Sequence, residues 1–103
     1  MSWLVLLAAG LFEIAWAVGL KAAQGRFWIL VATGTAMVAS VLLLYLALRD
    51  LPLGTAYAVW TGIGAVGTVA AGILMFGESA DAVRLICIGL IVAGIAGLKV
   101  VTP

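Results

Sequence analysis

An acidic side chain, Glu13, lies in the apolar segment GLFEIAW, and no other charge occurs between Trp3 and Leu20. Counted from Trp3 at about 1.5 Å of helical rise per residue, Glu13 lies about 15 Å along the segment, near the centre of a bilayer core. A charge there costs about 3 kcal/mol or more, and acids at this depth often serve ion or proton pathways. The plainer alternative is a protonated side chain that hydrogen-bonds another helix. We interpret Glu13 as a site that a proton and a cation occupy in turn, so that the two are exchanged across the membrane.

Three residues near Glu13 could complete a cation site. Trp16 follows the acid by three residues, so it shares the helix face, and its indole N–H is a donor that could hold the carboxylate. Gly10 lies on the same face and would leave space beside the acid. Ser40 is the most central hydroxyl of the next apolar segment, although a lone serine in a helix often bonds only its own backbone.

Two aromatic residues further along the chain, Tyr57 and Trp60, share one helix face. Tyr57 could equally be an interfacial anchor, whereas Trp60, about 9 Å in from Gly54, is less easily explained in that way. One acid with several aromatic side chains suits a cation through charge and cation–π attraction. Lys99 has two interpretations: a cation that snorkels at the end of a membrane segment, or a residue that lines an entrance to the site.

The elements that must position these side chains follow from composition. The chain has 103 residues, of which 67% are hydrophobic and 9% charged, whereas soluble domains are nearer half apolar and a quarter charged. Because about 20 helical residues cross a bilayer core, the sequence predicts an all-α integral membrane protein with a single domain. Its four expected membrane spans are residues 3–20, 28–48, 54–76 and 84–101.

Several function classes are excluded. The net charge of +1, without a basic run, argues against nucleic-acid binding. A chain with no histidine and a single cysteine, Cys87, can build neither a metal site of the Cys/His kind nor an intrachain disulfide. No nucleophile–histidine pair and no phosphate-binding loop occurs, so we expect neither an enzyme nor a cofactor.

The distribution of basic residues predicts an antiparallel pair. With four spans, Arg49 and Lys99 lie on the side of the termini, and Lys21, Arg26 and Arg84 lie on the other. Such a balance gives almost no positive-inside bias, so the chain is expected to insert in both orientations. An inverted homodimer would have eight helices and a two-fold axis in the membrane plane, as in many transporters.

Small residues recur every four positions in two of the spans. Stripes of this kind let helix backbones approach closely in lipid. The stripe in the fourth span is assigned mainly to dimerisation, and the one in the third span to the site and a flexible region around Gly62 and Gly64. They comprise Gly89, Ala93 and Gly97 in the fourth span, and Gly64, Thr68 and Gly72 in the third.

Three stretches of the sequence, GLFEIAWAVGLK, LPLGTAYAVWTGIGAVG and GIAGLK, closely resemble the small multidrug resistance transporters, and the resemblance covers essentially the whole chain. Within that family, Trp16 and the GLK ending at Lys99 are similar to the guanidinium-exporter subtype; the exporters of polyaromatic cations usually differ at the position of Trp16. The resemblance implies an antiparallel homodimer in the bacterial inner membrane that exchanges protons for a cation.

Carried onto this chain, the resemblance implies a role for each candidate residue. The two Glu13 carboxylates would form the shared proton and substrate site, with Gly10 lining the pocket. The hydrogen-bond network around them would comprise Trp16, Ser40, Tyr57 and Trp60. The expected partners are a guanidinium-type cation, protons, membrane lipid and a second copy of the chain.

Guanidinium suits a carboxylate site because its planar N–H donors bind carboxylate oxygens two at a time. The first alternative is a broad exporter of lipophilic quaternary ammonium cations, with the same fold and the same use of Glu13. The second is a non-transporting membrane protein or an obligate half of a heterodimer, against which the balanced charges argue. A channel is the third, and a buried acid between spans suits alternating access better than open conduction.

Overall fold

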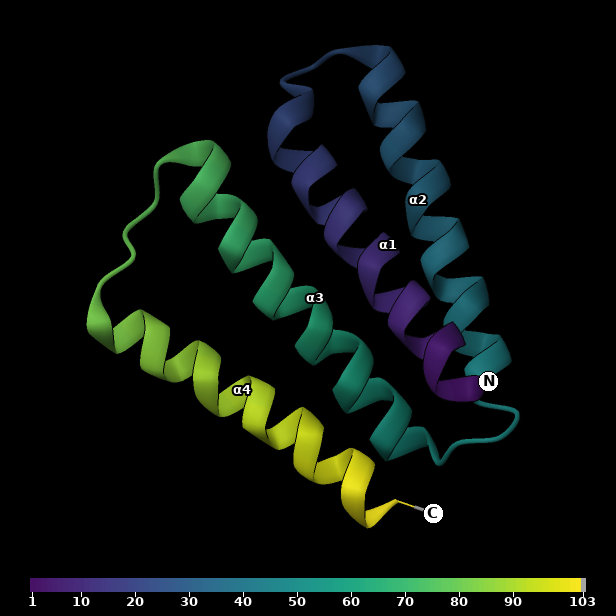
Figure 1. The fold of residues 1–103 in the computed structure, drawn as a ribbon. Coiled ribbons are helices and arrows are strands. Elements are labelled where there is room, and N and C mark those ends of the chain that lie inside the picture. The colour runs from purple at the N-terminus through teal and green to yellow at the C-terminus, as the bar shows by residue number, and fades with distance from the viewer. Residues whose placement is uncertain (103) are drawn as a thin grey trace.

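The computed structural model describes residues 1–102 and consists of helices joined by short loops (Figure 1); Pro103 lies outside the described part. The four helices are α1 (Ser2–Ala23), α2 (Phe27–Ala47), α3 (Leu53–Phe76) and α4 (Ala82–Val101). Each is long and apolar enough to cross a membrane, so the expected all-helical membrane architecture is confirmed. Both ends of the chain and the α2–α3 loop lie at the same end of the molecule (Figure 1).

Turn residues mark the helix boundaries. Gln24 takes the left-handed conformation after α1, with φ 46°, and Gly25 follows with φ 81°, a conformation that glycine adopts without strain. Pro52 precedes α3 in an extended conformation, as expected for a residue whose ring cannot continue the preceding helix. The chain therefore reverses direction within a few residues, and consecutive helices run antiparallel.

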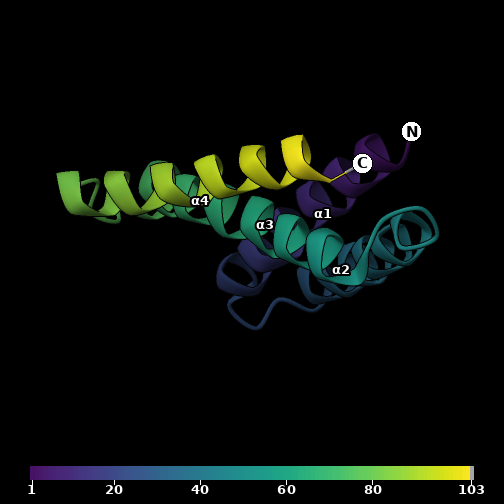
Figure 2. The ribbon, with the colours of Figure 1, turned by 90° about the horizontal axis from the view of Figure 1, so that it is seen from below.

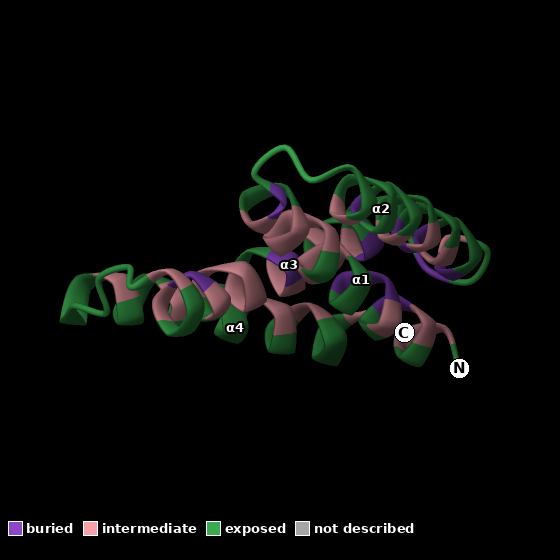
Figure 3. Ribbon diagram, turned by 90° about the horizontal axis from the view of Figure 1, so that it is seen from above, coloured by how far each residue is buried: buried purple, intermediate pink, exposed green. Residues whose placement is uncertain are grey.

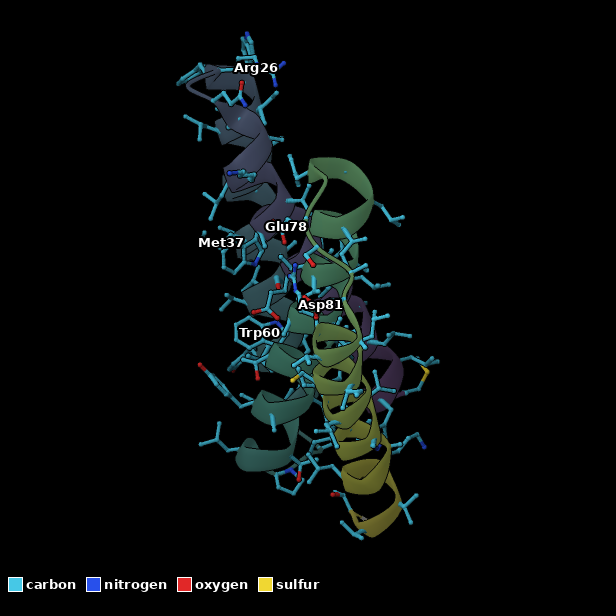
Figure 4. All side chains as sticks on the ribbon, turned by 90° about the vertical axis from the view of Figure 1, so that its left-hand side faces the viewer. Arg26, Met37, Trp60, Glu78 and Asp81 are labelled. Carbon is cyan, nitrogen blue, oxygen red and sulfur yellow. The ribbon has the colours of Figure 1, made fainter. Side chains whose placement is uncertain are left out.

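The α3–α4 loop is held together by polar contacts. Gly77 ends α3 in the left-handed region, with φ 68°. Asp81 caps α4: its Oδ1 accepts a hydrogen bond from the backbone N–H of Arg84 at 2.9 Å. The Arg84 guanidinium also pairs with Glu78 at 3.2 Å, and Figure 4 marks both acids on this loop. The α3–α4 loop and the N-terminus of α4 thus form one charged cap.

In Figure 1 the helices follow one another across the molecule in the order α2, α1, α3, α4. The molecule measures 43 × 34 × 17 Å, and Figures 2 and 3 show α4 extending away from the group formed by α1, α2 and α3. Among the described residues, the backbone of α4 approaches α3 alone, and α4 reaches α1 only through side chains such as Lys99, which lies over Trp3. The buried apolar core lies where the first three helices meet; it comprises Leu6, Ala9, Leu44, Ala47, Leu51, Ala56 and Val59.

Small residues bring α1 close to its two neighbours. A β-carbon at Gly19 would overlap the side chain of Thr33 on α2. A β-carbon at Gly10 would lie 2.6 Å from Cγ2 of Ile63 on α3. Such close approach is how membrane helices associate when lipid removes the hydrophobic driving force.

The outer helix, α4, has no buried residue (Figure 3). The residues assigned to dimer contact, Gly89, Ala93 and Gly97, are all exposed. A β-carbon at either glycine would meet no atom within 4 Å. The stripe therefore plays no part in packing α4 against its own chain.

Candidate functional site

The carboxyl group of Glu13 lies between α1 and α3. Glu13 is the twelfth of the 22 residues of α1, about 16 Å from its first residue at the standard helical rise. A β-carbon at Gly64 of α3 would overlap the carboxyl group, so the absent side chain at Gly64 creates its space. Oε1 of Glu13 is buried and has no hydrogen-bond partner among the described residues. An unpaired buried polar atom is costly, and native proteins keep few of them.

Trp16 has the second unpaired polar atom of this region. Its Nε1 is buried and donates to no acceptor in the described part of the chain. The sequence suggested that this N–H could hold the Glu13 carboxylate, but the structure contains no hydrogen bond between the two residues. One acceptor and one donor, a single helical turn apart on α1, are thus left unsatisfied within one protomer.

Ser40 links α1, α2 and α3. Its hydroxyl donates to the carbonyl oxygen of Ala9 on α1 at 2.7 Å and accepts from Nε1 of Trp60 on α3 at 2.9 Å. Ser40 is fully buried, and Figure 4 marks Trp60 on α3. The serine therefore does not bond its own helix. It fixes the rotation of the Trp60 indole relative to α1 and α2.

Tyr57 lies one turn before Trp60 and packs against it. The two rings meet edge to face, with centroids 5.5 Å apart. The Tyr57 side chain is 52% exposed, so one side of the aromatic pair is open. The structure thus brings Ser40, Tyr57 and Trp60 together, and Trp60 lies one helical turn before Gly64, the residue of α3 that faces the acid.

The remaining candidates lie elsewhere. Gly10 faces Ile63, as described above, and serves the contact of α1 with α3. Nζ of Lys99, near the end of α4, lies 5.3 Å from the ring centroid of Trp3. The sequence assigned the stripe that contains Gly64 to the site and a flexible region, but it did not predict that Gly64 lies against Glu13. No sequence signal pairs Gly64 with Glu13, because only the register of α1 against α3 brings them together.

This arrangement suits recognition of a cation. Among residues 1–102, no group of three or more potential metal ligands occurs. The site offers one carboxylate at mid-helix depth, an unpaired indole donor near it, and a fixed indole with an open aromatic neighbour. Carboxylate oxygens and aromatic faces are the two features that attract organic cations.

Comparison with known proteins gives consistent matches. The family model described as Small Multidrug Resistance protein matches residues 1–91. The chain is 58% identical over 104 residues to a protein named guanidinium exporter from Citrobacter freundii, covering 99% of both chains. It is 59% identical over 101 residues to a guanidinium exporter from Salmonella typhimurium strain LT2, covering 96% of both. A guanidinium exporter from Yersinia pseudotuberculosis is 55% identical over 101 residues, covering 96% of this chain and 97% of that protein.

Proposed function

This chain belongs to the small multidrug resistance family, and from that premise we propose that it exports guanidinium in exchange for protons. The resemblance found in the sequence is thereby confirmed, and the chain is a multi-pass transport protein of the bacterial inner membrane. Full-length relatives named guanidinium exporter support the choice of substrate. The exchange for protons and the residues that perform it are our proposal from the site.

The observation that carries the proposal is the unpaired carboxyl oxygen of Glu13. A carboxylate at this depth needs either a proton or a cation to be tolerated. Guanidinium is planar and presents paired N–H donors, so a carboxylate can accept two of its hydrogen bonds at once. Proton and guanidinium would then compete for the same oxygen atoms. This competition is what exchange requires.

The surrounding side chains would keep the acid and its substrate in position. The Trp60–Ser40–Ala9 chain of hydrogen bonds holds one indole rigid between three helices. In our proposal, Trp16 supplies its free N–H to the loaded site and Tyr57 presents its open ring to the cation. A compact site with fixed donors favours a small, N–H-rich cation over a bulky quaternary ammonium, which has no N–H to offer.

We propose further that two copies form an antiparallel homodimer in which the two Glu13 side chains share one site. The α4 helix without buried residues and the balanced basic residues support this assembly. Four helices in a body 17 Å thick are too few to enclose a substrate site at mid-depth. A second, inverted copy would close the site and would place both carboxylates near a two-fold axis, where they would titrate as a coupled pair.

The test is transport current from proteoliposomes on a solid-supported membrane at neutral pH. Guanidinium should evoke a current in the wild-type protein and none in Glu13→Gln. Tetra-alkylammonium should evoke a much smaller current. A strong response to tetra-alkylammonium without any to guanidinium would assign the chain to the quaternary-ammonium branch. Equal currents from the wild type and Glu13→Gln would overturn the role of the acid.

A further inference from the structure

An apolar groove runs along α3 between α1 and α4, on the side of Ile63 rather than that of Trp60. It consists of two adjacent pockets, of about 360 and 250 Å³, both lined by Leu7 of α1, Ile63 of α3 and Ile95 of α4. The groove exists because the backbone of α4 packs closely against α3 but not against α1, which it reaches only through side chains such as Lys99. Nothing in the proposed transport cycle uses this groove.

One end of the groove is charged. Lys99 and Trp3 both line the pocket nearest the chain termini, with the ammonium 5.3 Å from the centre of the indole ring. Figure 2 shows the C-terminal end of α4 beside the start of α1. Among the described residues, the one ion pair is Arg84–Glu78 at the opposite end of α4, so no acid of this part of the chain neutralises Lys99. A lysine and a tryptophan at a span end are typical of the level of lipid headgroups.

The length of the groove matches one leaflet. Its lining on α1 extends from Trp3 to Ile14, eleven residues later. At the standard helical rise this is about 16 Å, roughly half the thickness of a bilayer hydrocarbon core of about 30 Å. The groove therefore runs from the headgroup level to the centre of the membrane.

We propose that this groove is a binding site for an anionic phospholipid, with one acyl chain along Ile63 and the phosphate at Lys99. The ammonium supplies a charge-assisted contact to phosphate, and the apolar walls take the chain. A helix of a second copy fits less well. At the charged end, α1 and α4 approach each other at the Lys99–Trp3 contact. The space left there is too narrow for a helix, which is about 10 Å across. This inference does not rest on guanidinium export.

The test is native mass spectrometry of the full chain in detergent micelles, with phosphatidylglycerol or phosphatidylcholine of identical acyl chains. The wild type should retain more phosphatidylglycerol than phosphatidylcholine. Lys99→Gln should reduce that retention by about five-fold, the scale for one cation beside an anionic headgroup, whereas Lys99→Arg should preserve it. Lys21→Gln, at the opposite end of α1, is the matched charge control and should leave retention unchanged.

A second variant tests the apolar part of the groove. Ala96 is exposed on α4 and lines the groove, so Ala96→Phe would fill it with little disturbance of the α3–α4 contact. It should abolish lipid retention, while Leu90→Phe, on the same helix but outside the groove, should not. The proposal would be overturned if the wild type retained both lipids equally. It would also be overturned if Lys99→Gln and Lys21→Gln retained phosphatidylglycerol equally. An Ala96→Phe protein that no longer forms a dimer but still retains lipid would also overturn the proposal, because the groove would then hold a helix of the second copy.

Discussion

The carboxyl group of Glu13 lies directly against the α-carbon of Gly64, in space that any side chain at position 64 would fill. The two residues are on different helices, α1 and α3, and are 51 positions apart in the sequence. The space beside the acid was expected from Gly10, but Gly64 provides it. A change at Gly64 should act on the site through the position of the carboxyl group alone.

Replacing Gly64 by alanine should impair transport without removing any functional group. The new methyl would overlap the carboxyl group, and strain from overfilling a closed site is about 1–3 kcal/mol. We expect guanidinium flux into proteoliposomes to fall by about ten-fold or more. Gly34→Ala is the control, because a β-carbon there meets no atom within 4 Å. Equal flux from the two variants would show that Glu13 does not need this space.

The bridge through Ser40 should stabilise the helix arrangement. Ser40→Ala removes the acceptor of the Trp60 N–H and the donor to the Ala9 carbonyl. Interhelical hydrogen bonds in membrane proteins contribute about 0.6 kcal/mol on average, so we expect a loss of about 1 kcal/mol in the free energy of unfolding. A double-mutant cycle with Trp60→Phe should give a coupling energy of similar size.

Thr35→Ala is the matched control for the Ser40 experiment. Thr35 also lies on α2, but its hydroxyl is exposed and donates to the Val31 carbonyl of its own helix at 2.9 Å. Its removal breaks no contact between helices. Equal destabilisation by the two substitutions, or a coupling energy near zero between Ser40 and Trp60, would contradict the bridge.

Trp16 should matter for transport and not for stability. Its buried N–H has no partner within the protomer, so Trp16→Phe removes an unsatisfied donor and keeps most of the ring. We expect unchanged thermal unfolding in detergent, together with a weaker apparent affinity for guanidinium in the current assay. Trp28→Phe, at a side chain that is 79% exposed, should change neither quantity. A loss of stability without a change in affinity would make Trp16 a packing residue.

The α3–α4 loop should contribute a pH-dependent part of the stability that is separate from transport. The backbone N–H of Arg84 and the Ser79 hydroxyl stabilise the ionised form and lower the pKa of Asp81 below its usual value of about 3.9. Because the folded-state pKa is the lower one, this stabilisation is complete above about pH 4 and is lost as the pH falls through the folded-state pKa.

Asp81→Ala should therefore lower the unfolding temperature at pH 7 and have a smaller effect as the medium becomes strongly acidic. Thermal unfolding from pH 7 to pH 2.5 measures this difference, and guanidinium currents at neutral pH should persist. A destabilisation that is the same at every pH would show that the Asp81 charge plays no part in the cap.

The helices were predictable from the sequence because apolar runs end at charged residues and turn residues. The rotation of each helix about its own axis was not predictable. A helix that is apolar all round has no polar face to orient it, so the bridge from Ser40 to Trp60 could not be derived. The same limit hid the contact of Glu13 with Gly64. The side-chain types of the site, an acid with indoles and a serine, were visible because polar groups are rare in such segments.

Two placements show what packing adds to sequence spacing. Trp16 and Glu13 share a helix face by spacing, yet no hydrogen bond joins them, because a shared face does not bring an indole N–H to a carboxylate oxygen. Lys99 and Trp3 come from opposite ends of the chain and meet only because α4 returns beside the start of α1. The stripe on α4 has no partner within its own chain, and its assignment to dimer contact stays a prediction.

Competition between proton and guanidinium at Glu13 is the central claim, and proton release in weakly buffered detergent solution tests it most directly. Guanidinium chloride is added to the purified protein and the pH change is recorded beside sodium chloride as the control. The wild type should release protons in proportion to the guanidinium bound, and Glu13→Gln should release none. Guanidinium binding without proton release, or equal release from Glu13→Gln, would contradict the account.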